Sequence, residues 1–348
     1  MVREPERLVR GLSVVIPLYN SAASLPTLLA RLSEALPTIG RPFEIILVDD
    51  GSPDDSAAIA QQHLSMIPEL VVISLTRNFG QHPALLAGIR ASRYDLTLTM
   101  DDDLQHRPEE ITRLLDAMTA DIDLVYGQAA EEEHGFWRNV SSRLVKGSLA
   151  AAVGNDVASQ ASAFRLFRTY LRDAFEASRD PFVSIDVMLS WATTRLTAVE
   201  VTMDQRPIGQ SNYTFRKLVR HAMNMLTGFS VVPLRIVTYA GFGFALLGAA
   251  VLIFVLVRYV VDGGSIPGFP FLASIIAIFS GVQLFALGVL GEYLGRMHFR
   301  SMHRPAYVVR DRSDATTIER GAVDGLDHAM RIGEGKQIVP DRDTLDHE

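Results

Sequence analysis

The sequence contains no cysteine among its 348 residues. This absence excludes disulfides, thiolate zinc sites, cysteine nucleophiles and iron–sulfur clusters, and it suits a reducing compartment. Two phosphate-binding motifs are also missing, since no G-x-G-x-x-G follows the first predicted strand and no G-x-x-x-x-G-K-[ST] occurs in the chain. Residues 1–11 are charged and lack an apolar stretch, so we expect no signal peptide. Dinucleotide enzymes, P-loop proteins and disulfide scaffolds are therefore unsupported.

What the sequence does have is an excess of apolar residues. Its mean hydropathy is +0.17 although 21% of its residues are charged, which indicates that apolar residues are concentrated in part of the chain. Two uncharged runs, at 236–257 and 268–291, meet this expectation. At roughly 1.5 Å per helical residue, each run is long enough for a hydrocarbon core of about 30 Å. We predict a transmembrane helical hairpin, with two buried core helices as the alternative.

The charges that flank the two runs predict their orientation. Residues 207–235 carry basic residues and no acid, and residues 296–312 carry basic residues against Asp311 alone. The loop between the runs has only Arg258 and Asp262. The positive-inside bias therefore predicts that both flanks lie in the cytoplasm. Within the first flank, apolar residues recur at helical spacing over 215–226, which indicates a helix on the membrane surface; a solvated helix packed on the domain is the alternative.

The first 200 residues show a different pattern, in which short β-rich runs alternate with helical ones. Strand-like runs lie at 12–17, 43–48, 70–74 and 96–100, and helix-like runs at 23–35, 56–64, 83–91 and 109–120. This alternation predicts an α/β domain with a mostly parallel sheet. Ligands of such sheets bind beyond the carboxyl ends of the strands. The polar segments that follow the four strands, at 17–20, 49–52, 76–80 and 101–105, are therefore candidates for the site.

Three consecutive aspartates follow the fourth of these strands. Asp101 and Asp103, with Gln105 beyond them, offer hard oxygen ligands suited to Mg²⁺ or Mn²⁺ bridging a diphosphate. A solvated acidic loop is the alternative interpretation. The position directly after an apolar strand favours the ligand interpretation.

Five segments occur in a fixed order along the chain: IPLYN at 16–20, VDDGS at 48–52, RNFGQ at 77–81, MDDDLQ at 100–105 and AFRLF at 163–167. They resemble the successive motifs of family 2 glycosyltransferases with the GT-A fold. RPIGQS at 206–211 and LGEYLGR at 290–296 further resemble the polyprenyl-phosphate glycosyltransferases, which include dolichol-phosphate mannose synthases and undecaprenyl-phosphate glucose and formamido-arabinose transferases. The resemblance covers residues 12–312.

The resemblance implies roles for the matching positions. The nucleotide and donor sugar would be bound by Pro17, Tyr19, Asn20, Asp49, Asp50, Asp101, Arg206 and Ser211. A divalent metal, Mg or Mn, would be held by Asp101, Asp103 and Gln105. The acceptor phosphate would be bound by Arg138, Arg143 and Arg165, and the catalytic residues would be Asp103, Asp156 and Arg165. The residues alone also allow simpler roles, such as Pro17 ending its strand and Arg165 lying on a strand surface.

Together these patterns predict five segments. They are an N-terminal segment at 1–11, a cytoplasmic GT-A catalytic domain at 12–205, a donor-closing loop and juxtamembrane amphipathic helix at 206–235, a hairpin at 236–291 and a partly disordered cytoplasmic tail at 292–348. The chain is expected in the inner or plasma membrane, with its catalytic domain in the cytoplasm.

The predicted function is that of an inverting transferase that moves one sugar from a nucleotide-diphosphate sugar, UDP favoured over GDP, to a polyprenyl monophosphate of undecaprenyl, decaprenyl or dolichyl type. The bilayer is a further expected partner, nucleic acid is not, and a homo-oligomer is left open. One alternative is a processive polysaccharide synthase, although no Q-x-x-R-W motif occurs around Trp191. Another is a non-catalytic membrane scaffold that binds a nucleotide.

Overall fold

An eight-stranded sheet forms the centre of the N-terminal domain, in the order β7-β5-β6-β4-β1-β2-β3-β8. The computed structural model describes residues 8–129, 160–176, 184–204, 232–261, 268–302 and 305–314. The strands are β1 (Val9–Leu18), β2 (Phe43–Asp49), β3 (Leu70–Leu75), β4 (Tyr94–Thr99), β5 (Leu124–Ala129), β6 (Arg165–Arg168), β7 (Leu196–Val201) and β8 (Val309–Asp314). Among these eight, β6 and β8 run against the others. The predicted α/β class with a mostly parallel sheet is confirmed.

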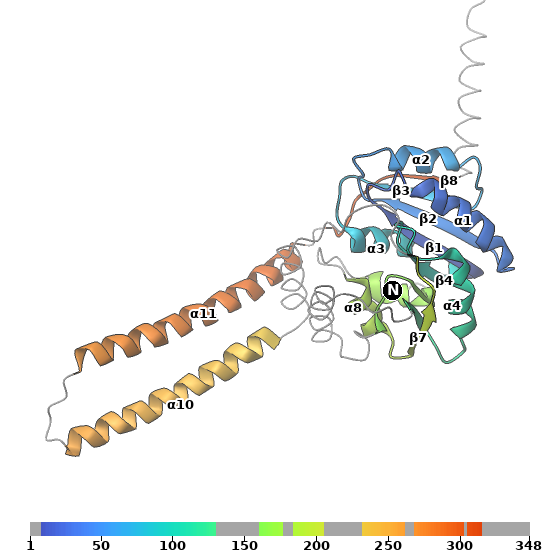
Figure 1. Cartoon of the computed structure of the whole chain (residues 1–348). Helices are drawn as coiled ribbons and strands as arrows, with labels where there is room; N and C mark the ends of the chain where they lie inside the picture. The colour runs from blue at the N-terminus through green and yellow to red at the C-terminus, as the bar shows by residue number, and fades with distance from the viewer. Residues whose placement is uncertain are drawn as a thin grey trace, which may run out of the picture.

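Helices cover both faces of the sheet (Figure 1). One face packs against α1 (Leu25–Thr38), α2 (Ser56–His63) and α4 (Ile111–Ala117), and the other against α3 (Gln81–Ala91) and α8 (Ile185–Ala192). Because side chains alternate along a strand, Val14 and Ile16 of β1 join the first core and Val15 joins the second. Short helices connect the elements: η1 (Pro108–Glu110), η2 (Thr169–Arg172) and α7 (Asp173–Glu176).

The register of the parallel strands brings their carboxyl ends to one edge of the sheet. Leu18 of β1 pairs with Asp49 of β2, and Asp49 pairs with Ser74 of β3. On the other side of β1, Val15 pairs with Thr99 of β4. The polar segments that follow these four strands therefore start at neighbouring points along this edge.

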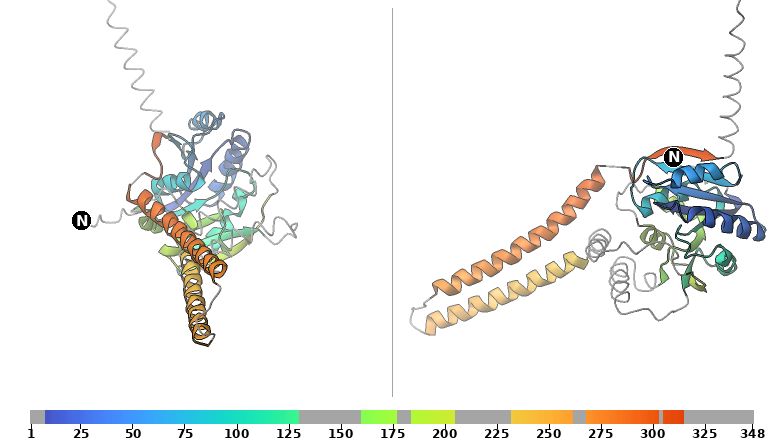
Figure 2. Two further views of the ribbon diagram at one scale, coloured as in Figure 1. Left: turned by 90° about the vertical axis from the view of Figure 1, so that its left-hand side faces the viewer. Right: turned by 45° about the horizontal axis from the view of Figure 1, so that its top comes forward.

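Two long helices, α10 (Val232–Val261) and α11 (Phe269–Ser301), extend side by side away from the domain (Figures 1 and 2). The Phe244 and Phe279 rings meet edge to face with centroids 6.3 Å apart, and Gly248 packs on Phe279, where a Cβ would come within 2.9 Å of the ring. Within the part of the chain that the structure describes, one helix is long and apolar enough to cross a membrane: the window Leu234–Val251 of α10 has a mean hydropathy of 1.6, and none of it is buried. The second span stays a prediction.

The C-terminal part of the chain departs from the predicted tail at 292–348. The helix α11 continues to Ser301, and β8 then lies antiparallel to β3, with Ser313 opposite Val72. Ala306 is buried in the core beside α3. The strand β8 therefore belongs to the sheet of the N-terminal domain, which the prediction of a domain at 12–205 and a tail at 292–348 did not include. Its sequence, VRDRSD, has no apolar alternation. An edge strand needs none, because backbone hydrogen bonds to its neighbour can hold it in place. The predicted surface helix at 215–226 and the tail from 315 onward lie outside the described residues.

Candidate active site

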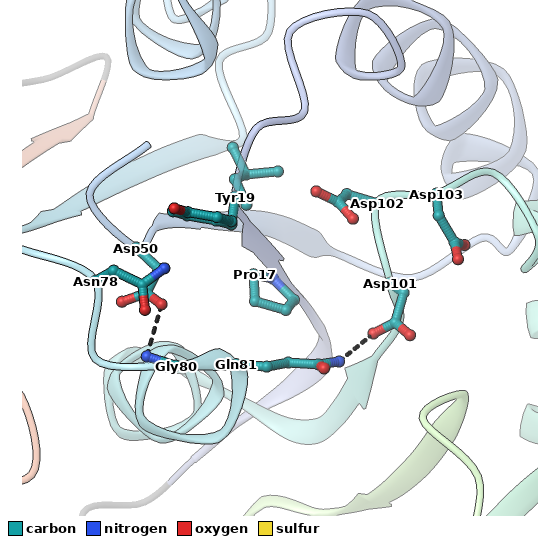
Figure 3. Close-up of a pocket in the computed structure, with 10 residues that line it drawn as sticks. Pro17, Tyr19, Asp50, Asn78, Gly80, Gln81, Asp101, Asp102 and Asp103 are labelled. Atoms are coloured by element: carbon teal, nitrogen blue, oxygen red, sulfur yellow. Dashed lines mark hydrogen bonds between the residues drawn. The ribbon is translucent and has the colours of Figure 1, made fainter. Parts of the chain in front are cut away.

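A pocket lies at the edge of the sheet where four parallel strands end (Figure 3). Its volume is about 240 Å³, several times the roughly 30 Å³ that one water occupies in the liquid. Nine of the ten lining residues come from the four polar segments that the sequence predicts, and Gln81 directly follows one of them: Pro17, Leu18, Tyr19, Asp50, Asn78, Gly80, Gln81, Asp101, Asp102 and Asp103. Chain segments more than 80 residues apart therefore meet here because the strand register aligns their ends.

Asp50, at the left side of the pocket in Figure 3, holds the loop that follows β3. Its two carboxylate oxygens accept hydrogen bonds of 2.7 Å each from the backbone amides of Phe79 and Gly80. Burial raises the pKa of Asp50, and these two amides oppose that rise. Gly51 next to it has a φ of +66°, and a Cβ there would lie 2.6 Å from the carbonyl carbon of Arg77. The glycine of the VDDGS motif thus lets the loop after β3 approach the end of β2.

The three aspartates after β4 point in two directions (Figure 3). The carboxylates of Asp101 and Asp103 lie on one side of the turn, where Gln81 donates a 2.7 Å hydrogen bond to Asp101. Asp102 points to the opposite side and accepts a hydrogen bond from the hydroxyl of Ser21. Burial raises the pKa of Asp102 to about 6, and the charges of Asp101 and Asp103 add to this rise. Asp102 is therefore directed away from Asp101 and Asp103, the two aspartates that the sequence predicts as metal ligands.

The donor set suits a hard divalent ion. Among the described residues no group of three or more His, Cys, Asp or Glu side chains could hold a metal. A magnesium-type ion, however, is commonly held by one or two carboxylates together with the phosphates of its substrate. Asp101 and Asp103 supply such carboxylates in the pocket. Gln105 follows in the same turn, and its backbone N–H donates a 3.1 Å hydrogen bond to the Asp103 carboxylate. The predicted ligands therefore fit the ion, and their role stays a prediction.

Arg165 is the first residue of β6 and pairs with Thr99, the last residue of β4. Its side chain is 2% exposed, its guanidinium pairs with Asp186 of α8, and its Nε donates to the hydroxyl of Thr99 at 3.0 Å. Tyr126 also donates to Asp186, at 3.3 Å. Arg165 is not among the residues that line the described pocket. The alternative that Arg165 lies on the surface of its strand is therefore excluded. Its role at the acceptor phosphate stays a prediction, and in this structure its partner is Asp186.

The other predicted residues divide into two groups. Asn20 and Asp49 lie beside the pocket, where the amide of Asn20 donates to Ser52 at 3.3 Å and the buried carboxylate of Asp49 accepts from the Ser52 amide at 3.1 Å. The remaining candidates lie outside the described residues: Arg138, Arg143, Asp156, Arg206 and Ser211. Their roles stay predictions.

Sequence reasoning gave no role to several pocket residues, namely Leu18, Asn78, Gly80, Gln81 and Asp102. Asn78 and Gly80 lie in the candidate segment at 76–80 and Gln81 follows it, so the rule that ligands bind beyond strand ends could have given these residues roles. For Asp102 the spacing carries no such signal, because only the fold shows that it faces Ser21.

Comparisons with known proteins agree with these motifs. Residues 13–177 match the glycosyl transferase family 2 domain. Undecaprenyl-phosphate 4-deoxy-4-formamido-L-arabinose transferase of Pseudomonas aeruginosa (strain LESB58) is 37% identical over 300 residues, which cover 85% of this chain and 88% of that one. The transferase of the same name from Aeromonas hydrophila is 32% identical over 319 residues, covering 90% and 98% of the two chains.

Among solved structures, glucosyl-3-phosphoglycerate synthase of Mycobacterium tuberculosis has a TM-score of 0.45 and 19% identity, over 63% of this chain and 78% of that one. The relatives at 32–37% identity match nearly the whole of both chains. The chain belongs to glycosyltransferase family 2, and it is a glycosyltransferase.

Proposed function

We propose that this glycosyltransferase transfers one sugar from a UDP-sugar to undecaprenyl phosphate, with inversion at the anomeric carbon. The observation that carries the proposal is the pocket that unites Asp50, after β2, with Asp101 and Asp103, after β4. The acceptor class comes from the relatives, whose names specify undecaprenyl phosphate and which match 88% or more of their own length.

The polar groups of the pocket suit the two ends of a nucleotide-sugar. The side that Asp50 organises, with Tyr19 and Asn78, would take the nucleoside. The side that holds Asp101, Asp103 and Gln81 would take the diphosphate (Figure 3). Asp101, Asp103 and Gln105 would hold a Mg²⁺ or Mn²⁺ ion, which when bound neutralises charge on the diphosphate. The helix α3 begins at Gln81 beside this side, so the positive end of its dipole also favours an anion there.

The proposed reaction needs positioning more than proton transfer. An acceptor phosphate oxygen bonds to the anomeric carbon, the bond from that carbon to the diphosphate breaks, and the nucleoside diphosphate leaves. The second pKa of a phosphate monoester is about 6, so near neutral pH the acceptor is largely a dianion that needs no base. Arg138 and Arg143 would orient this dianion. Arg165, paired with Asp186, would support the site of the acceptor phosphate. Asp156 would orient the sugar or the arginines.

The product assay tests this proposal directly. Membranes that contain the protein are incubated with undecaprenyl phosphate and a panel of donors that begins with UDP-4-deoxy-4-formamido-L-arabinose and includes UDP-glucose and GDP-mannose. Mass spectrometry of the lipids should then show undecaprenyl phosphate with a single added sugar, from a UDP donor. Longer products would indicate a processive synthase, and UDP binding without any product would indicate a scaffold.

We also propose that α10 and α11 both cross the membrane and leave the catalytic domain in the cytoplasm. Exposed apolar side chains on both helices support this, among them Leu246, Ile253, Leu284 and Leu287. The absence of cysteine offers a clean test, because one introduced cysteine is then the only thiol. In intact cells an impermeant maleimide should label Ser265→Cys, which lies between the two helices in sequence. It should label Ser65→Cys, on the exposed surface of the catalytic domain, only after permeabilisation. Labelling of both from the same side would refute the hairpin.

A further inference from the structure

We propose that His106 is a positioning residue that holds the metal-binding turn at 101–105 in place by accepting a hydrogen bond from the backbone of Asp101. This inference rests on the proposed function, because it concerns the turn that would hold the divalent ion. His106 itself is not among the residues that line the described pocket. Its effect would therefore pass through Asp101 and Asp103 and not through contact with the substrate.

The turn needs support from outside. Leu104 has a φ of +63°, a left-handed conformation that costs a branched, bulky residue roughly 1–2 kcal/mol. Three consecutive carboxylates also repel one another at this point. Hydrogen bonds within the turn, such as the 3.1 Å bond from the Gln105 amide to Asp103, fix only part of it. Without further contacts the spacing between Asp101 and Asp103 would vary.

His106 supplies such a contact through its side chain. Its Nδ1 lies 3.1 Å from the backbone nitrogen of Asp101 and accepts the hydrogen bond of that amide. A neutral imidazole has one acceptor nitrogen and one donor nitrogen, so this bond assigns the ring proton to Nε2. The ring is 7% exposed and stacks on Phe164, with centroids 5.1 Å apart and planes 16° from parallel. Packing therefore leaves the acceptor atom little freedom to move.

The backbone around His106 is fixed as well. His106 forms an antiparallel bridge with Met203, and the carbonyl of Gln105 accepts a 2.9 Å hydrogen bond from the amide of Asp204. The Asp204 carboxylate in turn pairs with Arg107, whose Nε donates at 2.7 Å, and with Arg31 at 3.2 Å. The imidazole is thus held by its ring stacking and by its own main chain. The geometry is that of a support behind metal ligands, which commonly changes metal affinity by about 10–100-fold when it is removed.

Binding of Mn²⁺ to the full chain in the presence of UDP tests this role. The free Mn²⁺ signal in electron paramagnetic resonance gives the affinity without any turnover. His106→Phe keeps an aromatic ring on Phe164 but has no acceptor, so it should weaken Mn²⁺ binding about tenfold. His106→Asn offers an oxygen near the position of Nδ1, so it should stay within about threefold of the wild type. His63→Phe removes a histidine of α2 that is not among the pocket residues, and it should have no effect.

The outcomes separate this proposal from the proposed function. If the wild type binds no Mn²⁺ with UDP, the metal site is refuted and this role with it. If the wild type binds Mn²⁺ and His106→Phe binds it equally well, the positioning role alone is refuted. A folded His106→Asn that loses as much affinity as His106→Phe would also refute it, because the acceptor would then not be the cause. Thermal unfolding checks the fold of each variant, and His106→Leu replaces His106→Phe if the latter does not fold.

Discussion

The Oδ2 atom of Asp50 accepts a 2.7 Å hydrogen bond from the amide of Gly80, which ties the end of β2 to the residue before α3. The Oδ1 atom makes an equal bond to the amide of Phe79. The Asp50 carboxylate thus holds the end of the loop at 76–80. This contact matters for binding because Asn78 and Gly80 line the pocket.

Asp50→Asn should therefore weaken UDP binding. Asparagine has one carbonyl oxygen and an NH₂ group that cannot accept a hydrogen bond, so one backbone amide of the loop loses its partner, at a cost of about 1–3 kcal/mol. We expect a loss of affinity of roughly tenfold in titration calorimetry with UDP. Asp55→Asn is the matched control, since Asp55 is exposed in the same loop region. Equal UDP affinity in Asp50→Asn and the wild type would contradict this role.

Asp103→Asn should abolish most turnover while leaving the fold intact. The variant keeps a side-chain oxygen for the 3.1 Å bond from the Gln105 amide, but it loses the negative charge that would face the cation. Such charge stabilisation is commonly worth several kcal/mol, so we expect a fall in kcat of at least about 100-fold. Asp116→Asn, an exposed aspartate of α4, should keep wild-type activity. Full wild-type activity in excess chelator would reject the metal role.

The ion pair between Asp123 and Arg195 predicts how the stability of the fold depends on pH. The hydrogen bond from the Arg195 guanidinium lowers the pKa of Asp123 from 3.8 to about 2. A carboxyl with a lowered folded-state pKa stabilises the fold above its unfolded pKa, and this contribution is lost as the pH falls through the folded value. Because Arg195 is half exposed, we expect a contribution of about 1–2 kcal/mol.

The measurement is the thermal midpoint of Asp123→Asn against the wild type. Near neutral pH the variant should melt lower, and the difference should shrink as the pH falls from about 4 towards about 2. Asp121→Asn, which changes an exposed aspartate two residues away, should match the wild type at every pH. A difference that stays constant across this range would show that the ion pair is not its source.

Removal of β8 should destabilise the catalytic domain and weaken UDP binding. The carbonyl of Val308 accepts a 3.0 Å hydrogen bond from the amide of Thr76, the residue at which the pocket loop begins. A chain that ends at Met302 loses this bond and leaves the edge of β3 unpaired. We expect a thermal midpoint lower by at least about 5 °C. A chain that ends at Asp314 keeps β8 and serves as the control; equal midpoints for the two truncations would assign β8 no role in the fold.

The α/β class and the segments that form the pocket could be predicted from local sequence patterns. Strand-like runs predicted β1 to β4 near their observed bounds, and the polar residues after them, from Pro17 to Asp103, meet as expected. The physical reason is local: apolar strands and the turns that end them are encoded in neighbouring residues, and parallel strands share one binding edge. The uncharged runs in α10 and α11 are equally local signals.

Which side chains face one another could not be predicted in this way, because it depends on how distant segments pack. Asp102 meets Ser21 across 81 residues of sequence, and Arg165, which was expected at the acceptor phosphate, is buried against Asp186. The strand β8 was missed because its polar residues carry no pattern, and β3 supplies its hydrogen-bond partners. His106 acquires its role only when Phe164 packs on its ring. Such contacts depend on segments that are distant in the chain, and the spacing within a single motif does not contain them.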